Sequence, residues 1–365
     1  MESPMSQIAK VSCQRLSVPL HTPFVTALRS TTTTDTLVVR LTDTDGVTGW
    51  GEAPQVWRVT GESLAGAEAC VSGPLADTVV GADAGDLAEL CRRVADAVPG
   101  NFGAKSAVDV ALHDLTARRL GVSLPRFLGS TRHRVPTDVT LSASDAGSLG
   151  EAAVKRVADG FTVLKMKVGA AGDVERVRSV RERVGPDVTI RLDANQGWKP
   201  RQAVRTIRAI EDAGLDVELV EQPVPAHDLD GLAWVTDRVD TPVLADEAVY
   251  GVRDLVELIR RRAADMVNVK LAKCGGLSPA RTMLALARAH DMQALIGSMM
   301  ESAIGVGAAA SLASAHDGSL VHDLDAAWWS SASPMRGGLR YDDAAVVLPD
   351  APGLGIEEII DERIG

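Results

Sequence analysis

The sequence predicts an α/β protein in which a (β/α)8 barrel follows a small α+β domain. Three observations support this prediction: the length of 365 residues, short apolar runs that recur through the middle of the chain, and a different pattern before residue 130. The length suits a large barrel with an attached domain. Aromatic residues make up only 3% of the chain, so the core must consist mainly of aliphatic side chains, as parallel strands covered by helices require.

Residues 1–130 show strands followed by helices, which is typical of an α+β domain. The apolar runs 37–42 and 47–52 flank Asp45-Gly46, a strong hairpin signal. Between the first strand and this hairpin, residues 21–34 have no helical period, and we expect them to form a mobile loop. Helical periodicity follows in three segments, residues 62–75, 86–97 and 104–120.

Residues 131–333 contain eight short apolar runs, each followed by a helical segment, and this rhythm predicts the barrel. Polar or small residues near the ends of the last seven runs lie 24 to 28 residues apart: Lys165, Asp193, Glu221, Asp246, Lys270, Gly297 and Asp323. A doubly wound open sheet is the alternative, but eight even repeats suit a closed barrel better. The C-terminal segment, residues 334–365, is too short for a domain, and we expect it to pack on the first one.

Charge and cysteine content exclude several classes of protein. The net charge of −11 argues against a nucleic-acid-binding surface or a polybasic membrane patch. The chain has neither an apolar run of membrane-spanning length nor a secretion signal pattern, so we expect a cytoplasmic protein. Its four cysteines are far apart in sequence, which predicts free thiols rather than disulfides or a zinc site.

Three carboxylates, Asp193, Glu221 and Asp246, end three consecutive predicted strands and should converge at the barrel mouth. Such like charges are unfavourable unless a cation lies between them, and oxygen ligands alone favour Mg²⁺, with Mn²⁺ as a substitute. Lys165 and Lys167 share one face of the second strand, and Lys270 ends the sixth, on the opposite side of the ring. One ammonium on each face of a substrate suits proton removal from one face of a carbon and return to the other. Partial burial and nearby positive charge, from Lys165 beside Lys167 and from the divalent cation, should lower the pKa of a lysine that acts as a base.

The ordered motifs of the chain resemble the enolase superfamily, muconate-lactonizing subgroup. They are Lys165-Met166-Lys167, Asp193-Ala194-Asn195, Glu221-Gln222-Pro223, Asp246-Glu247 and Asn268-Val269-Lys270-Leu271. The resemblance implies a modified (β/α)8 TIM barrel, with an N-terminal α+β capping domain that the C-terminal tail completes. It also implies magnesium on the three acids and a catalytic pair, Lys167 and Lys270. Lys165, Asn195 and Glu247 would support this pair, and Lys165 would also meet the substrate carboxylate.

The last predicted strand carries Asp323 and Asp325 on one face, and two anions there suit a cationic group such as a free α-ammonium. This Asp-x-Asp is similar to that of dipeptide epimerases, so the resemblance implies a metal-dependent isomerase of a small dipeptide. The enzyme would invert the α-carbon of the C-terminal residue by two-base proton transfer through an enolate. Arg29 resembles the loop arginine that meets the side-chain carboxylate in epimerases of L-Ala-D/L-Glu. Further expected substrate contacts are Thr140, Ser298, Met300 and Glu301.

Several alternatives remain open from the sequence. Within the superfamily they are an N-acylamino acid racemase or a cycloisomerase, and outside it a metal-free Schiff-base lyase or a catalytically silent binding protein. Residues 305–310 fit a dinucleotide-binding pattern, but their distance from the preceding strand favours close helix packing instead. We expect a homo-oligomer. Bulky residues, Trp57, Arg58, Trp328 and Trp329, are expected at the substrate mouth, where they would affect specificity.

Overall fold

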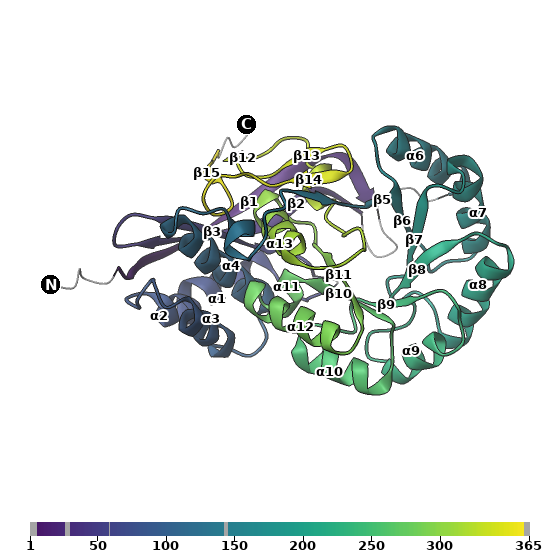
Figure 1. The fold of residues 1–365 in the computed structure, drawn as a ribbon, viewed down its shortest axis with the longest axis horizontal. Helices are drawn as coiled ribbons and strands as arrows, with labels where there is room; N and C mark the ends of the chain where they lie inside the picture. Colours follow the sequence, from purple (N-terminus) through teal and green to yellow (C-terminus); the bar gives the residue numbers. More distant parts are fainter. Residues whose placement is uncertain (1–5, 26–29, 58, 142–144, 361–365) are drawn as a thin grey trace.

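The computed structural model describes residues 6–25, 30–57, 59–141 and 145–360. An N-terminal domain, built of a long antiparallel sheet and helices, lies beside a curved parallel sheet that helices surround (Figure 1). Within the described residues, none of the helices has the length and apolar character needed to cross a membrane.

The N-terminal sheet has the order β1-β2-β3, with β1 at Ile8–Val25, β2 at Ser30–Asp43 and β3 at Thr48–Pro54. The expected mobile loop is wrong for residues 21–25 and 30–34, which extend β1 and β2: Phe24 pairs with Thr31, and Thr33 pairs with Pro19. Residues 26–29 of that predicted loop lie outside the described residues. A run of threonines fits a strand as well as a loop, because β-branched side chains pack well on a pleated surface. The helices of this domain are α1 (Leu64–Cys70), the π-helical turn η1 (Val71–Leu75), α2 (Ala76–Val79), α3 (Leu87–Asp96), α4 (Phe102–Arg119) and α5 (Leu124–Phe127).

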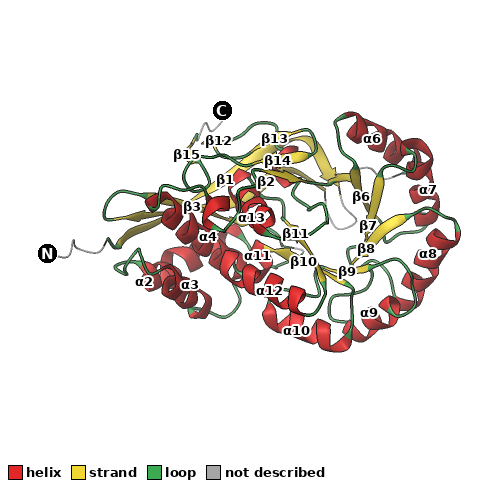
Figure 2. Cartoon of the chain, in the orientation of Figure 1, coloured by secondary structure: helices red, strands yellow, loops and turns green. Residues whose placement is uncertain are grey.

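The barrel contains a seven-stranded parallel sheet in the order β5 to β11, with helices on its outer side (Figure 2). The strands are β5 (Val139–Leu141), β6 (Val163–Lys167), β7 (Thr189–Asp193), β8 (Val217–Glu221), β9 (Val243–Ala245), β10 (Met266–Lys270) and β11 (Gln293–Gly297). The helices are α6 (Ala146–Ala158), α7 (Asp173–Val184), α8 (Pro200–Asp212), α9 (Leu229–Thr236), α10 (Val252–Arg261), α11 (Leu271–Cys274), α12 (Leu277–Ala289) and α13 (Ala303–Ala315).

The expected eighth strand is wrong as a regular strand. His322 and Asp323 make only isolated parallel bridges, to Thr137 and Gly297, and these two bridges close the ring between β5 and β11. A buried arginine on β7 reinforces this closure. Arg191 Nη1 donates to Asp138 Oδ2 at 2.9 Å and to the Val321 carbonyl oxygen at 2.7 Å. One side chain thus links the segment before β5 to the segment that replaces the eighth strand, where the backbone forms no regular ladder.

Carboxylates of the N-terminal domain hold it to the barrel and to the tail. Glu52, in β3, accepts hydrogen bonds from the Ser302 and Gly305 amides at 2.8 Å, at the start of α13. Glu52 thus fills the anion-binding end of that helix, and residues 305–310 belong to a packed helix as expected. Asp114, in α4, accepts from the amides of Trp50 and Leu354, which joins the hairpin to the tail. The remaining strands are β4 (Arg134–Pro136), β12 (Met335–Gly337), β13 (Arg340–Asp342), β14 (Ala345–Val347) and β15 (Ile356–Ile359).

Candidate active site

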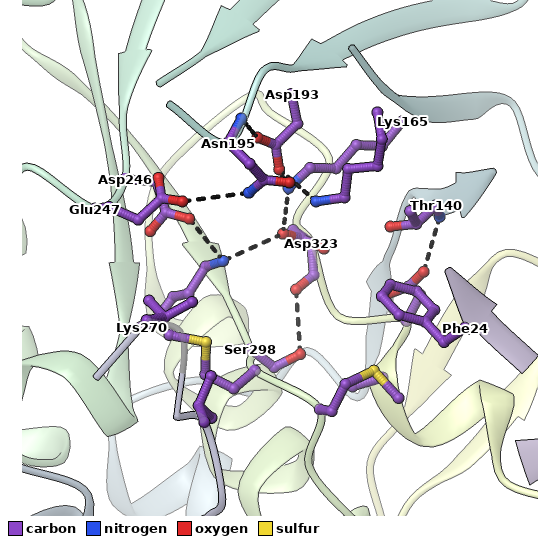
Figure 3. A pocket seen from close by; sticks show the side chains of 17 residues that line it. Phe24, Thr140, Lys165, Asp193, Asn195, Asp246, Glu247, Lys270, Ser298 and Asp323 are labelled. Carbon is purple, nitrogen blue, oxygen red and sulfur yellow. Dashed lines mark hydrogen bonds and ion pairs between the residues drawn. The ribbon is translucent and has the colours of Figure 1, made fainter. Parts of the chain in front are cut away.

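One cavity opens at the carboxyl ends of the parallel strands, and most of the predicted site residues meet there (Figure 3). The predicted residues that line it are Thr140, Lys165, Lys167, Asp193, Asn195, Asp246, Glu247, Lys270, Ser298, Met300, Asp323 and Asp325. Glu221 is not part of the lining but contacts Lys165. Glu301 is buried behind the wall, where burial and the nearby charge of Glu52 raise its pKa well above the usual value. Glu301 is not among the residues that line the cavity, and a substrate contact by Glu301 stays a prediction.

Three buried carboxylates end neighbouring strands, as predicted. Asp193 ends β7, Glu221 ends β8 and Asp246 directly follows β9. Burial raises the pKa of Glu221 to about 8; Lys165 opposes this shift, whereas the charges of Asp193 and Asp246 add to it. The cluster therefore holds three anions together only when enough positive charge surrounds it.

The backbone after these strands adopts a left-handed conformation at non-glycine residues. Asn195 has φ 41°, Gln196 φ 69° and Gln222 φ 37°, values that are uncommon outside glycine and that cluster at functional sites. At Gln222 this conformation accompanies a contact between strands: Gln222 Oε1 accepts hydrogen bonds from the amides of Asp246 and Ala248, both at 3.0 Å. This side chain ties the end of β8 to the segment that carries Asp246.

Lysine side chains approach the carboxylates from both flanks. Lys165 Nζ lies 2.6 Å from Glu221 Oε2 and 2.9 Å from Asp323 Oδ2, and Lys167 Nζ lies 2.6 Å from Asp193 Oδ2. On the other flank, Lys270 Nζ lies 3.0 Å from Asp246 Oδ2. Strands β7, β8 and β9 separate β6 from β10, so the two catalytic candidates, Lys167 and Lys270, flank the carboxylates as the sequence predicted.

The expected lowering of the lysine pKa values depends on a nearby divalent cation and stays a prediction, because the protein's own side chains raise the pKa of Lys165 and Lys270. Burial lowers the pKa of each, but carboxylates in contact with them outweigh it: Asp323 and Glu221 for Lys165, and Asp246 for Lys270. These carboxylates therefore favour the ammonium form of both lysines, and a divalent cation on Asp193, Glu221 and Asp246 would offset part of that effect. Local sequence could not show this balance, because it depends on acids contributed by distant strands.

The donor set fits a divalent cation with oxygen ligands. Asp193, Glu221 and Asp246 offer carboxylate oxygens, the ligands that Mg²⁺ prefers. Close by, Glu247 accepts a hydrogen bond from Asn195 Nδ2 at 3.2 Å through Oε1, while its buried Oε2 has no hydrogen-bond partner among the described residues. Burial and the charges of Asp246 and Asp193 raise the pKa of Glu247 to about 7. A cation at this place would relieve the repulsion among these acids.

A second buried group, Cys91, Asp109 and His113, brings its potential ligand atoms within 4.8 Å of one another. The contacts of these three residues indicate a structural role rather than a metal site. Asp109 Oδ1 accepts hydrogen bonds from the amides of Leu277 and Ser278 at the start of α12, and burial raises the pKa of the Cys91 thiol. This group joins the N-terminal domain to the barrel. All four cysteines are free thiols, as expected.

The tryptophans do not occupy the positions expected of them. The cavity wall from the N-terminal domain consists of Phe24, Val56 and Val59, whereas Trp57 is 62% exposed and lies outside the lining. Trp328 and Trp329 also lie outside it and pack on each other, with ring centroids 5.1 Å apart. Trp328 and Trp329 belong to a short 3-10 helix, η2 (Ala326–Trp329), in which Ala326 rather than a tryptophan lines the cavity. Arg29 and Arg58 lie outside the described residues.

Two residues that the sequence did not assign to the site also shape it. Lys273 Nζ lies 2.5 Å from Asp246 Oδ1 and also donates to the Asp246 carbonyl oxygen. Lys270 contacts the other carboxylate oxygen, Oδ2, so each oxygen of Asp246 has its own lysine. Gly297, at the end of β11, leaves room for the catalytic candidate: a Cβ there would lie 2.9 Å from Lys270 Cε. The only available signal was sequence proximity to Lys270 and to a strand end.

Known proteins resemble this chain over almost its full length. Residues 8–129 match the mandelate racemase/muconate lactonizing enzyme N-terminal domain, and residues 148–363 match the enolase C-terminal domain-like family. The L-Ala-D/L-Glu epimerase of Bacillus subtilis is 39% identical over 96% of both chains. The hydrophobic dipeptide epimerase of Enterococcus faecalis is 35% identical over 96% of this chain and 99% of that protein.

Solved structures of dipeptide epimerases are also similar to this chain in fold. A substrate-liganded complex of the Bacillus subtilis epimerase has a TM-score of 0.94 and 39% identity, covering 97% of this chain and 99% of that chain. The Enterococcus faecalis dipeptide epimerase, complexed with Mg and L-Leu-L-Tyr, has a TM-score of 0.92 and 34% identity, covering 96% and 100%. The predicted fold, a modified barrel with a capping domain, is confirmed.

Proposed function

The chain belongs to the mandelate racemase/muconate lactonizing enzyme family, as its motifs indicated, and we propose that it is a metal-dependent dipeptide epimerase, an isomerase. The observation that carries the proposal is the placement of two chemistries in one cavity: lysines flank the carboxylate cluster, and Asp323 and Asp325 line the wall beside β11. A dipeptide has a carboxylate at one end, which suits the lysines and a cation on the carboxylate cluster, and an ammonium at the other end, which suits Asp323 and Asp325.

The lysine pair explains inversion. One lysine, as the free amine, takes the α-proton of the C-terminal residue, and the electrons of the C–H bond pass into the adjacent carboxylate to give an enolate. The opposite lysine, as the ammonium, donates a proton to the other face of the α-carbon. A divalent cation on Asp193, Glu221 and Asp246 would supply positive charge next to that carboxylate as the enolate forms. Lys165 contributes further fixed positive charge.

Exchange in heavy water tests the function. The protein, loaded with Mg²⁺, is incubated with a library of L-Ala-X dipeptides, and the expected result is a mass gain of one deuterium at the α-carbon of X with appearance of the opposite configuration. L-Ala-L-Glu and dipeptides with an apolar X are the first candidates, since relatives named for both kinds each align with 96% of this chain. Absence of exchange in all dipeptides, with exchange in N-acylamino acids, would instead favour a racemase.

Chelation tests the metal. Treatment with EDTA is expected to abolish exchange and epimerisation, and added Mg²⁺ should restore both, with Mn²⁺ as a substitute. Activity that survives complete metal removal, verified by elemental analysis, would contradict the metal-dependent mechanism and favour a Schiff-base reaction of lysine. A homo-oligomer and a cytoplasmic location remain predictions from the sequence.

A further inference from the structure

The wall that carries Asp323 and Asp325 is held in an unusual way for a barrel. Only two isolated bridges replace the eighth strand there. Backbone hydrogen bonds hold Asp323, whose amide donates to the Ile296 carbonyl oxygen and whose carbonyl oxygen accepts from the Ser298 amide, but this pairing does not continue to Asp325. Beyond Asp323, side chains hold the segment. Thr137 Oγ1 accepts a hydrogen bond from the Leu324 amide at 2.9 Å, and the Tyr341 hydroxyl donates to the Leu324 carbonyl oxygen at 2.6 Å. Both backbone polar groups of Leu324, the residue between the two acids, are thus hydrogen-bonded to side chains.

Asp325 itself is held by two donors. Its Oδ2 accepts hydrogen bonds from the Thr140 amide at 2.8 Å and from the indole nitrogen of Trp329 at 3.0 Å. Trp329 is only 2% exposed, and its ring packs against the rings of His21 and Phe24 from β1. The indole donor is therefore rigid, and it fixes one oxygen of Asp325 while the side chain still lines the cavity.

We propose that Trp329 and Tyr341 are positioning residues for recognition of the substrate's free ammonium, because they hold Asp325 and the Asp323–Asp325 peptide at the cavity wall. This inference rests on the proposed function. Neither residue lines the cavity, so each acts through an aspartate rather than by touching the substrate. The tail residue Tyr341 thereby couples the C-terminal segment to one end of the substrate.

The test compares two substrates that differ only in the ammonium. One is L-Ala-X, with X taken from the exchange screen, and the other is N-propionyl-X, which has the same shape without the amino group. Wild-type protein is expected to prefer L-Ala-X strongly in kcat/KM. Trp329→Phe and Tyr341→Phe each remove one hydrogen-bond donor and keep an aromatic ring, and each should raise KM for L-Ala-X about 10-fold. Neither should change kcat/KM for N-propionyl-X by more than about 2-fold.

The chain offers a matched control for each variant. Trp328→Phe changes the neighbouring tryptophan and keeps an aromatic ring against Trp329; because the indole hydrogen bond to Asp325 comes from Trp329, this variant should keep the wild-type preference for the free amine. Tyr250→Phe removes the other tyrosine hydroxyl, which donates to the Val59 carbonyl oxygen rather than to the Asp-x-Asp segment, and should keep the same preference. Asp325→Asn removes the negative charge of Asp325 itself and should lose the preference for the free amine.

The outcomes separate the inference from the function on which it rests. Equal losses on both substrates, or an unchanged preference in both variants while Asp325→Asn loses it, would overturn the positioning role. A wild-type protein that does not act on L-Ala-X, or that uses N-propionyl-X equally well, would overturn the proposed function itself. Thermal unfolding of each variant shows whether it is folded, and Tyr341→Phe carries the test alone if Trp329→Phe does not fold.

Discussion

Replacement of Lys270 by alanine is expected to lower epimerisation at least about 10³-fold, because general acid–base groups contribute about 10²–10⁴-fold and this variant lacks one of the two. The two-base arrangement also predicts which partial activity the variant should keep. Lys167 can still remove and return the α-proton of one diastereomer on its own face. The variant should therefore exchange that diastereomer with deuterium without inverting it, and Lys167→Ala should exchange only the other one.

Proton NMR in heavy water measures both quantities in the same sample, since loss of the α-proton signal reports exchange and a new set of signals reports inversion. Lys155→Ala, at an exposed position of α6 in the same barrel, is the control and should behave like wild type. If Lys270→Ala epimerised normally, or if both lysine variants exchanged the same diastereomer, the assignment of one lysine to each face would be wrong.

Replacement of Arg191 by methionine is expected to lower the free energy of unfolding by about 3–5 kcal/mol, because it leaves a buried charge without its partner. Arg191 is 1% exposed and bonds Asp138 and the Val321 carbonyl oxygen across the gap left by the eighth strand. Urea unfolding followed by circular dichroism gives the measurement. Arg134→Met breaks the exposed ion pair with Asp342 and should cost less than about 1 kcal/mol.

The loss should depend on pH in a defined direction. Burial, together with the charge of Asp323, raises the pKa of Asp138 well above its usual value, and Arg191 opposes that shift. The folded wild-type protein already binds the Asp138 proton more tightly than the unfolded chain does, and loss of Arg191 should tighten this binding further. Stability of Arg191→Met should therefore fall, relative to wild type, as the pH rises above the raised pKa of Asp138. An equal loss at every pH would show that packing, rather than the unpaired carboxylate, causes it.

The sequence by itself determined the order of the barrel strands and the residue at the end of each. Apolar runs at intervals of 24 to 28 residues mark β6 to β11, and the residues that end or directly follow them became the carboxylates and lysines of the site. These features are local, because strand periodicity, and the rule that strand ends meet at one edge of a parallel sheet, need no knowledge of distant contacts.

Only the tertiary structure decided which side chains support these residues and how charge is balanced among them. Arg191 closes the ring and Glu52 caps α13, while Tyr341 and Trp329 hold the Asp-x-Asp segment, each across more than one element. The raised pKa values of Lys165 and Lys270 likewise come from acids on other strands. Electrostatic shifts and hydrogen bonds are sums over neighbours in space, and along irregular segments neither sequence distance nor periodicity identifies those neighbours.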